Sequence, residues 1–348
     1  MENMVKQRDP FWDVIKGIAV ILMLFGHSIE YGMGAEYFES KAYMENPFFQ
    51  FIYGFHMPLF MFVSGYFFYR SIQKMTLREL ARKLSVRVVL PILSFSLIAF
   101  LYNHKMGLIS MSVVAIIKSF LVTCLSSLWF LWSYLYCSVL LGVCNKFKLD
   151  TWWVQFLIII FLYCIPDYYN TGNFKYMYPF FLLGYYCMKF DFLSHIFRKP
   201  LHVGISSSVI YLVLMAFCFT SDTLIYTTQV FLFKGDGVFM HLYNDLLRLV
   251  VGFLGVLGFV SLTKYFFEKR SCGTFVQALS DLGIKSLGIY CFQDIVVKYI
   301  PQNTPPLLCS LKIITVLVTF LVLLVISYIA TMICAKYRPL RLLFLGGR

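Results

Sequence analysis

Apolar stretches recur along the chain, and short polar segments separate them. A helix needs roughly 20 apolar residues to cross the hydrocarbon core of a bilayer, where its backbone groups must be satisfied within the segment. The pattern predicts an all-α polytopic membrane protein with about ten transmembrane helices. The expected spans are residues 12–31, 49–69, 84–102, 128–143, 152–165, 176–188, 203–220, 246–262, 282–300 and 307–334. The fifth and sixth spans are short, and residues 112–125 also fit an interfacial helix, so the count has a margin of one or two.

The composition agrees with a membrane location, and the distribution of charge predicts the orientation. Hydrophobic residues make up 60% of the chain and charged residues 14%, and the mean hydropathy is +0.76. With both termini in the cytoplasm, the inner segments hold 21 of the 30 Lys and Arg residues and the outer segments hold 7. Short loops rich in these residues stay inside, so we expect an even number of spans and cytoplasmic termini. The net charge of +13 follows from this rule and from attraction to anionic membrane lipids, without a nucleic acid partner.

The remaining composition predicts one membrane domain over residues 1–348, with no appended soluble domain. The ten cysteines form no C-x-x-C pair and no Cys/His ligand spacing, so we interpret them as small packing residues rather than a metal or disulfide framework. The first span has no small-residue cleavage pattern after its apolar run, and we expect it to stay in the mature protein.

Lys16 and His27 are the first candidates for chemistry, because ionisable residues within apolar spans are rare and costly. They are eleven residues apart, which places both on one face of a helix and roughly 16 Å apart along its axis. This spacing fits a functional pair. It fits equally well a structural interpretation, in which Lys16 extends to the membrane interface beside Asp13 and His27 only packs against its neighbours.

Polar side chains from four predicted spans share one depth. His27, His56, Arg248 and Gln293 all fall roughly 3 to 11 Å beneath the outer boundary. Because each would be unsatisfied if it faced lipid, the pattern indicates a polar cavity that opens to the outside. The alternative is a set of local pairs, such as Asp245 with Arg248, that hold helices together.

A dense basic cluster precedes the third span on the predicted cytoplasmic side, and it ends at Pro91. Its members are Arg78, Arg82, Lys83 and Arg87. Loops that stay inside commonly have this composition, but the cluster could also bind the phosphates of an anionic cofactor. The chain has no Gly-rich phosphate loop, no H-E-x-x-H and no G-x-S-x-G, so a P-loop ATPase, a zincin and an α/β-hydrolase are unsupported.

Several short blocks of sequence form a recognisable series along the chain. The first runs from Arg8 through Trp12, Asp13 and Lys16 to Gly26 and His27. The others are Phe55-His56-Met57-Pro58-Leu59-Phe60, Ser64-Gly65-Tyr66, the basic run into Arg87 and Pro91, Leu128-Trp129-Phe130-Leu131, Phe181-Leu182-Leu183-Gly184-Tyr185 and Ser286-Leu287-Gly288-Ile289-Tyr290. In these blocks the sequence resembles the integral-membrane acyltransferases called acyltransferase family 3, and within them the fucose-acetylase-like branch. These blocks span nearly the whole chain in the order of the family, and the first two are the most specific.

The resemblance implies a role for particular residues, with three departures. His27 corresponds to a His that is regarded as essential for transfer in this family. Lys16 lies at the position where most members have Arg. Lysine keeps the charge but loses the bidentate geometry of Arg. Arg82 and Arg87, the counterparts of a basic pair that is often three apart, are five apart here. Gln293 replaces a His that many members carry in the ninth helix.

The implied activity is transfer of an acyl group, acetyl by default, from cytosolic acyl-CoA to a hydroxyl of a surface or lipid-linked glycan in a bacterial inner membrane. Acyl-CoA would be a co-substrate, and no bound cofactor or metal is expected. The donor would be bound by Lys16, Arg82 and Arg87, and His27 would act as general base or carry the acyl group. His56, Arg248 and Gln293 would line the acceptor cavity. A polytopic transporter or glycan flippase is the alternative, although we detect no inverted repeat in the sequence.

Overall fold

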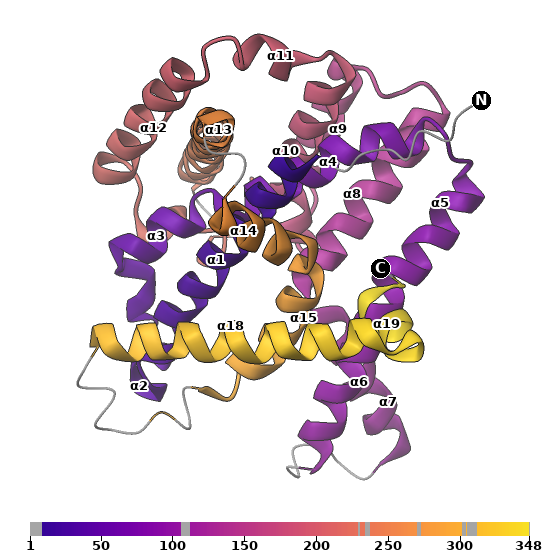
Figure 1. Cartoon of the computed structure of the whole chain (residues 1–348). Helices are drawn as coiled ribbons and strands as arrows, with labels where there is room; N and C mark the ends of the chain where they lie inside the picture. Colours follow the sequence, from indigo (N-terminus) through magenta and orange to yellow (C-terminus); the bar gives the residue numbers. More distant parts are fainter. Residues whose placement is uncertain are drawn as a thin grey trace.

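The computed structural model describes residues 9–105, 112–228, 230–233, 237–269, 273–300, 304 and 312–347, and this part of the chain is helical without strands (Figure 1). The longer helices are α1 (Pro10–Gly32), α4 (His56–Ile72), α6 (Leu90–Lys105), α8 (Trp129–Lys146), α10 (Thr171–Lys189), α12 (Pro200–Phe217), α13 (Val238–Lys269) and α18 (Lys312–Lys336). The shorter ones are α2 (Ala35–Glu39), η1 (Ala42–Glu45), α3 (Pro47–Tyr53), α5 (Leu77–Leu84), η2 (Ser85–Val89), α7 (Val113–Ser126), α9 (Trp152–Tyr163), α11 (Phe192–Ile196), η3 (Ser221–Thr223), α14 (Thr274–Ile284), α15 (Ser286–Val297) and α19 (Arg338–Leu345).

The predicted all-α polytopic membrane fold is confirmed. Six stretches within the described residues are long and apolar enough to cross a bilayer, or seven if α7 and α8, which meet at 74°, form one broken span. Each of the ten predicted spans coincides with helix over most of its described length, and residues 307–311 of the last lie outside the described part. The number ten and the cytoplasmic termini stay predictions.

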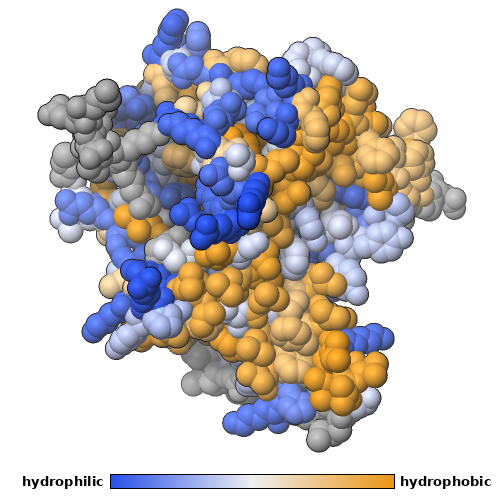
Figure 2. Space-filling model, turned by 90° about the vertical axis from the view of Figure 1, so that its right-hand side faces the viewer, coloured by the Kyte–Doolittle hydropathy of each residue, from blue (hydrophilic) through white to orange (hydrophobic). Residues whose placement is uncertain are grey.

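The surface of the fold suits lipid. Exposed apolar side chains run along α9, α12 and α18, which are among the least buried helices. They include Phe156, Phe161, Ile205, Val209, Leu321 and Val325. Figure 2 shows one face on which hydrophobic side chains cover much of the surface and hydrophilic side chains gather mainly along its top and left side. In water such areas would favour aggregation, whereas in a bilayer they contact acyl chains.

Helix α1 runs through the middle of the fold and packs closely against α14, α4 and α18. The α1–α14 contact depends on glycine. A Cβ added at Gly283 would lie 1.8 Å from the carbonyl oxygen of Asp13, and one added at Gly17 would lie 1.9 Å from that of Leu279. Small residues allow this close approach of two helix backbones in a membrane protein. The contact places the end of α14 and the start of α15 beside Lys16.

We expect Gly283→Ala to lower the thermal unfolding midpoint of the detergent-solubilised protein by several degrees. The added methyl group must push apart two backbones, and overpacking of this kind costs about 1 to 3 kcal/mol. Gly273→Ala is the matched control, because nothing lies within 4 Å of its added Cβ. Equal midpoints for the two variants would contradict the close contact.

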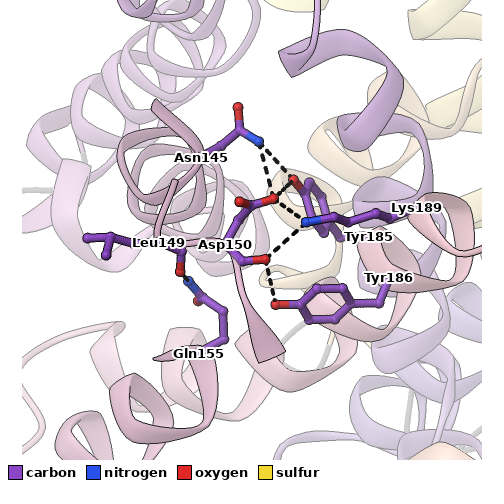
Figure 3. A network of polar contacts seen from close by, with 7 residues as sticks. All are labelled: Asn145, Leu149, Asp150, Gln155, Tyr185, Tyr186 and Lys189. Atoms are coloured by element: carbon purple, nitrogen blue, oxygen red, sulfur yellow. Dashed lines mark hydrogen bonds and ion pairs between the residues drawn. The ribbon is translucent and has the colours of Figure 1, made fainter. Parts of the chain in front are cut away.

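A polar network ties the end of α8 to α10 through the connection between α8 and α9 (Figure 3). The Asp150 carboxylate accepts hydrogen bonds from Lys189 Nζ at 2.6 Å and from the Tyr185 hydroxyl at 2.7 Å, and Tyr186 donates to the Asp150 carbonyl at 3.2 Å. Burial raises the pKa of Asp150, but the hydrogen bonds from Lys189 and Tyr185 bring that pKa below its ordinary value. The network holds α10 in place, and α10 in turn packs along α4.

Candidate active site

His27 lies in the last turns of α1, where it contacts Glu30 and Tyr53. The His27 Nδ1 atom is 3.1 Å from Glu30 Oε2 and 3.1 Å from the Tyr53 hydroxyl, which also donates to Glu30 Oε2 at 3.0 Å. The side chain of His27 is 20% exposed and that of Glu30 is 14% exposed. The three side chains therefore form one compact, mostly buried network.

This network favours one ring nitrogen of His27 as the reactive atom. The contact suits the tautomer in which Nδ1 carries a proton and donates it to the Glu30 carboxylate. In the neutral ring this leaves Nε2 with a lone pair. A carboxylate in this position also stabilises the imidazolium that forms when Nε2 takes a proton, as in a Ser-His-Asp triad.

Sequence reasoning found His27 but missed Glu30 and Tyr53. Glu30 follows His27 by three residues, which is a spacing that places two side chains next to each other on a helix, so its signal was present. Tyr53 comes from α3, and only the packing of α3 on α1 brings it to His27.

His56 is buried behind this network. It is 1% exposed, its Nδ1 donates to the carbonyl oxygen of Ile52 at 2.8 Å, and its ring lies 4.7 Å from that of Tyr53. His56 contacts the ring of Tyr53, and His27 contacts its hydroxyl. This arrangement suits a residue that supports Tyr53.

Lys16 lies at the other end of α1, beside two adjoining cavities of about 510 and 260 Å³. We call them together the basic cavity. Both parts are lined by Lys16, Val63, Ser64, Phe130 and Leu287. The larger part also contacts Lys285 and extends to Met23 and Met57, and the smaller part reaches Lys83 and Arg87. The cavity thus joins a rim of positive charge to the region next to His27.

The cationic groups of the basic cavity differ in how they are held. Lys16 Nζ is 2.6 Å from Asp13 Oδ1, the local pair that the sequence also allowed, and Lys16 lines the cavity as well. Lys83 donates to the Ser71 hydroxyl at 3.2 Å. Arg87 is exposed on η2 and borders the cavity, whereas Arg82 is exposed on α5 and is not among the lining residues. The sequence analysis named Lys83 only as a member of the basic cluster, and it did not assign Lys285 to the site.

Arg248 and Gln293 are both buried at the end of the fold where α1 ends. Arg248 is 2% exposed, and its Nε lies 3.5 Å from Asp245 Oδ1, so the local pair considered from the sequence is present. Arg248 also borders a narrow hollow together with Tyr53 and Met57. Gln293 is 1% exposed, and its Oε1 has no hydrogen-bond partner within the described residues.

The side chains in the described ranges include no group of three or more His, Cys, Asp or Glu residues that could hold a metal ion. The eight cysteines described are free, and most are buried. The chemistry available at His27 is that of an acid–base pair with a positively charged cavity behind it.

Comparisons with known proteins place the chain in a family. A family model described as an acyltransferase domain matches residues 9–336. The protein is similar to the nodulation protein NolL of Mesorhizobium japonicum, at 27% identity over 179 residues, and to NolL of Sinorhizobium fredii, at 29% over 181 residues. Each alignment covers 51% of this chain and 47% or 48% of the relative, so the chain spans about half the length of these curated relatives. No solved structure matches. Because the family model covers nearly the whole chain, the protein belongs to the integral-membrane acyltransferase family 3.

Proposed function

We propose that this membrane acyltransferase transfers an acyl group, acetyl by default, from cytosolic acyl-CoA to a hydroxyl of a surface or lipid-linked glycan. Membership of the family makes the protein an acyltransferase and argues against the alternative of a transporter or flippase. What we propose beyond family membership is the acyl-CoA donor, the glycan acceptor, the cytoplasmic position of both termini and a location in the bacterial inner membrane. Acyl-CoA is then a co-substrate, and no bound cofactor is required.

The observation that carries the proposal is the course of the basic cavity. It extends from Lys83, Arg87 and Lys16 to Met23, which precedes His27 by one helical turn, or about 6 Å. Lysine and arginine bind phosphate through charge-assisted hydrogen bonds. A CoA nucleotide at the rim would therefore direct its pantetheine arm and thioester along α1 toward His27.

In the proposed reaction, His27 Nε2 removes the proton from the acceptor hydroxyl as the hydroxyl oxygen attacks the thioester carbonyl carbon. The C–O bond forms, the C–S bond breaks, and the leaving CoA thiolate takes the proton from the imidazolium. Glu30 stabilises the imidazolium through Nδ1 while the charge is present. Nε2 is also the atom that would form a transient acyl-histidine.

The other candidate residues have supporting roles in this proposal. Lys16, Arg87 and Arg82 serve the donor, with Arg82 placed farther from the basic cavity than the other two. His56, Arg248 and Gln293 belong to the acceptor side, where Arg248 shares a hollow with Tyr53.

Donor binding gives the direct test. We expect Arg87→Gln to raise the KM for acetyl-CoA up to about tenfold, because a hydrogen bond to a charged group contributes about 1.5 to 3 kcal/mol and the exposure of Arg87 favours the low end of that range. Arg82→Gln should have a smaller effect, and Lys16→Arg should be tolerated better than Lys16→Ala. Steady-state thioester cleavage by the purified protein measures all four.

Arg198→Gln is the matched control, since this residue is exposed at the end of α11. If Arg87→Gln and Arg198→Gln have the same KM as the wild type, the basic cavity does not bind the CoA phosphates. The cluster would then only set the topology.

A further inference from the structure

Arg248 is held by the segment that joins α12 to α13. Its NH1 donates to the Thr228 carbonyl oxygen at 3.2 Å and its NH2 donates to the Thr228 hydroxyl. Its Nε faces the carbonyl oxygen of Asn244, at 3.2 Å, on its own helix. The two outer nitrogens of the guanidinium are thus occupied by two oxygens of one residue. This is the geometry in which arginine takes two oxygens of a ligand.

Asp245 lies beside Arg248 with little hydrogen bonding of its own. It is 1% exposed, and neither carboxylate oxygen has a hydrogen-bond partner among the residues described. Asp245 Oδ1 lies 3.5 Å from Arg248 Nε, which makes an ion pair but is too long for a good hydrogen bond. A buried carboxylate normally accepts several hydrogen bonds, so this one is suited to hydroxyl donors that come from outside the protein.

The hollow beside these two residues has aromatic walls. Tyr53, Trp129, Tyr176 and Tyr226 line it together with Arg248. Its volume is about 10 Å³, which is less than one sugar ring needs. Tyr226 closes it from the α12–α13 segment, with its ring 5.6 Å from that of Tyr53 and 6.5 Å from that of Trp129, and is itself 41% exposed.

The segment is anchored on either side of Thr228. At its start, the Phe219 backbone N–H donates to the carbonyl oxygen of Leu214 on α12 at 3.0 Å. At its end, the Val230 N–H donates to Asp167 Oδ2 at 3.0 Å, and Asp167 pairs with Lys175 at 2.6 Å. Between these anchors, Thr228 connects the segment to Arg248. Residues 221–228 could move outward while both ends stay attached.

We propose that residues 221–228 are a lid over an acceptor subsite for a neutral sugar, latched by Thr228 on Arg248. When the lid opens, two hydroxyl oxygens of the sugar replace the two oxygens of Thr228 on Arg248, and hydroxyl protons are donated to Asp245. The aromatic side chains pack against the faces of the sugar ring. Because the positive charge of Arg248 is offset by the negative charge of Asp245, the subsite favours a neutral sugar over an anionic one.

The position of this subsite fits the proposed transfer to a glycan, on which the inference rests. Tyr53 borders the hollow with its ring and donates to Glu30 with its hydroxyl, 3.1 Å from His27 Nδ1. Met57 borders both the hollow and the basic cavity. A sugar in the hollow would therefore lie against Tyr53, which contacts His27, and against Met57, which borders the cavity proposed for the donor.

Two substitutions should change sugar affinity in opposite directions. Thr228→Val removes one of the two oxygens from the latch, so the lid opens more often and the Kd for a sugar should fall about tenfold. Arg248→Lys keeps the charge beside Asp245 but loses the two-pronged contact, so the Kd should rise about tenfold. If the contact between Thr228 and Arg248 were purely structural, both variants would instead bind the sugar more weakly than the wild type does.

The affinities are measured by ligand-observed NMR titration of the purified full-length protein with methyl glycosides of glucose, galactose and fucose. 1-Hexanol serves as a hydroxyl compound without a sugar ring. Thr227→Val is the matched control, because the Thr227 hydroxyl donates to the Ser221 carbonyl oxygen at 2.6 Å and not to Arg248. Its Kd should equal that of the wild type.

Parallel shifts in Thr228→Val and Arg248→Lys would overturn the lid, and so would glycosides that bind no better than 1-hexanol. If Arg248→Lys does not fold, the direction of the shift in Thr228→Val decides alone. Acetyl-CoA cleavage is assayed separately. Its absence would contradict the proposed donor, while the titrations would still decide whether the lid exists.

Discussion

Replacing His27 by alanine should abolish acyl transfer and leave the protein in the membrane at a near-normal level. A base or nucleophile that takes part in the transition state contributes on the order of 10²- to 10⁴-fold to the rate. Alanine is a strong helix former, so α1 should persist. Mass spectrometry of surface glycans, with and without the variant gene, measures transfer in cells. Thioester cleavage by the purified variant measures it in detergent.

His202→Ala is a suitable control for the loss of a histidine, because His202 is exposed on α12. His56→Ala should reduce activity less than His27→Ala does, since His56 reaches the network only through the ring of Tyr53. A His27 variant that inserts normally and acylates at the wild-type rate would remove His27 from the mechanism. If His56 proves indispensable instead, the two roles are exchanged.

Glu30→Gln should lower kcat about a hundredfold or more, with little change in the KM for acetyl-CoA. The amide of glutamine can donate a hydrogen bond to Nδ1, which favours the tautomer with the proton on Nε2. That tautomer cannot act as a base, and the imidazolium also loses its negative partner. Tyr53→Phe should have a smaller effect, because it removes only the hydroxyl that donates to Glu30.

The split between kcat and KM separates this role from a structural one. Damage to the fold of α1 would also affect Lys16 and raise the KM for the donor, whereas a change of tautomer would not. Glu30→Asp, which keeps the charge, should recover part of the activity. Glu36→Gln, at an exposed position on α2, is the control and should behave as wild type. A Glu30→Gln variant with normal kcat would show that His27 does not need its carboxylate.

The fold class could be predicted from the sequence because hydrocarbon imposes one requirement on every span. Backbone groups must pair within the segment, so long apolar stretches become helices whatever their neighbours are. The broken spans were harder to foresee. Gly54 and Phe55 separate α3 from α4, and Lys285 separates α14 from α15, within stretches that hydropathy treats as continuous.

Within the site, periodicity along one helix was predictable and packing between helices was not. Lys16 and His27 lie on one face of α1 however the other helices pack around it. The same helical geometry places Glu30 next to His27. Tyr53 and Lys285 join the site only through the way α3, α14 and α15 pack on α1, which spacing in the sequence does not encode.

The basic cluster illustrates the same limit. Lys83 and Arg87 are four residues apart and face the basic cavity together, while Arg82 is turned about 100° away from Lys83. The π-helical turn η2 within this cluster also shifts the phase of the residues that follow it. Charge density alone therefore indicated the segment, but not which of its residues border the cavity.

Met57 separates the basic cavity from the hollow beside Arg248, since it borders both. At that point a flexible thioether side chain lies between the two compartments. Under the proposed transfer, an acyl group passes this point while the nucleotide stays behind and the aqueous phases remain apart. The protein could thus move a chemically activated group through the bilayer without dissipating the proton gradient across it.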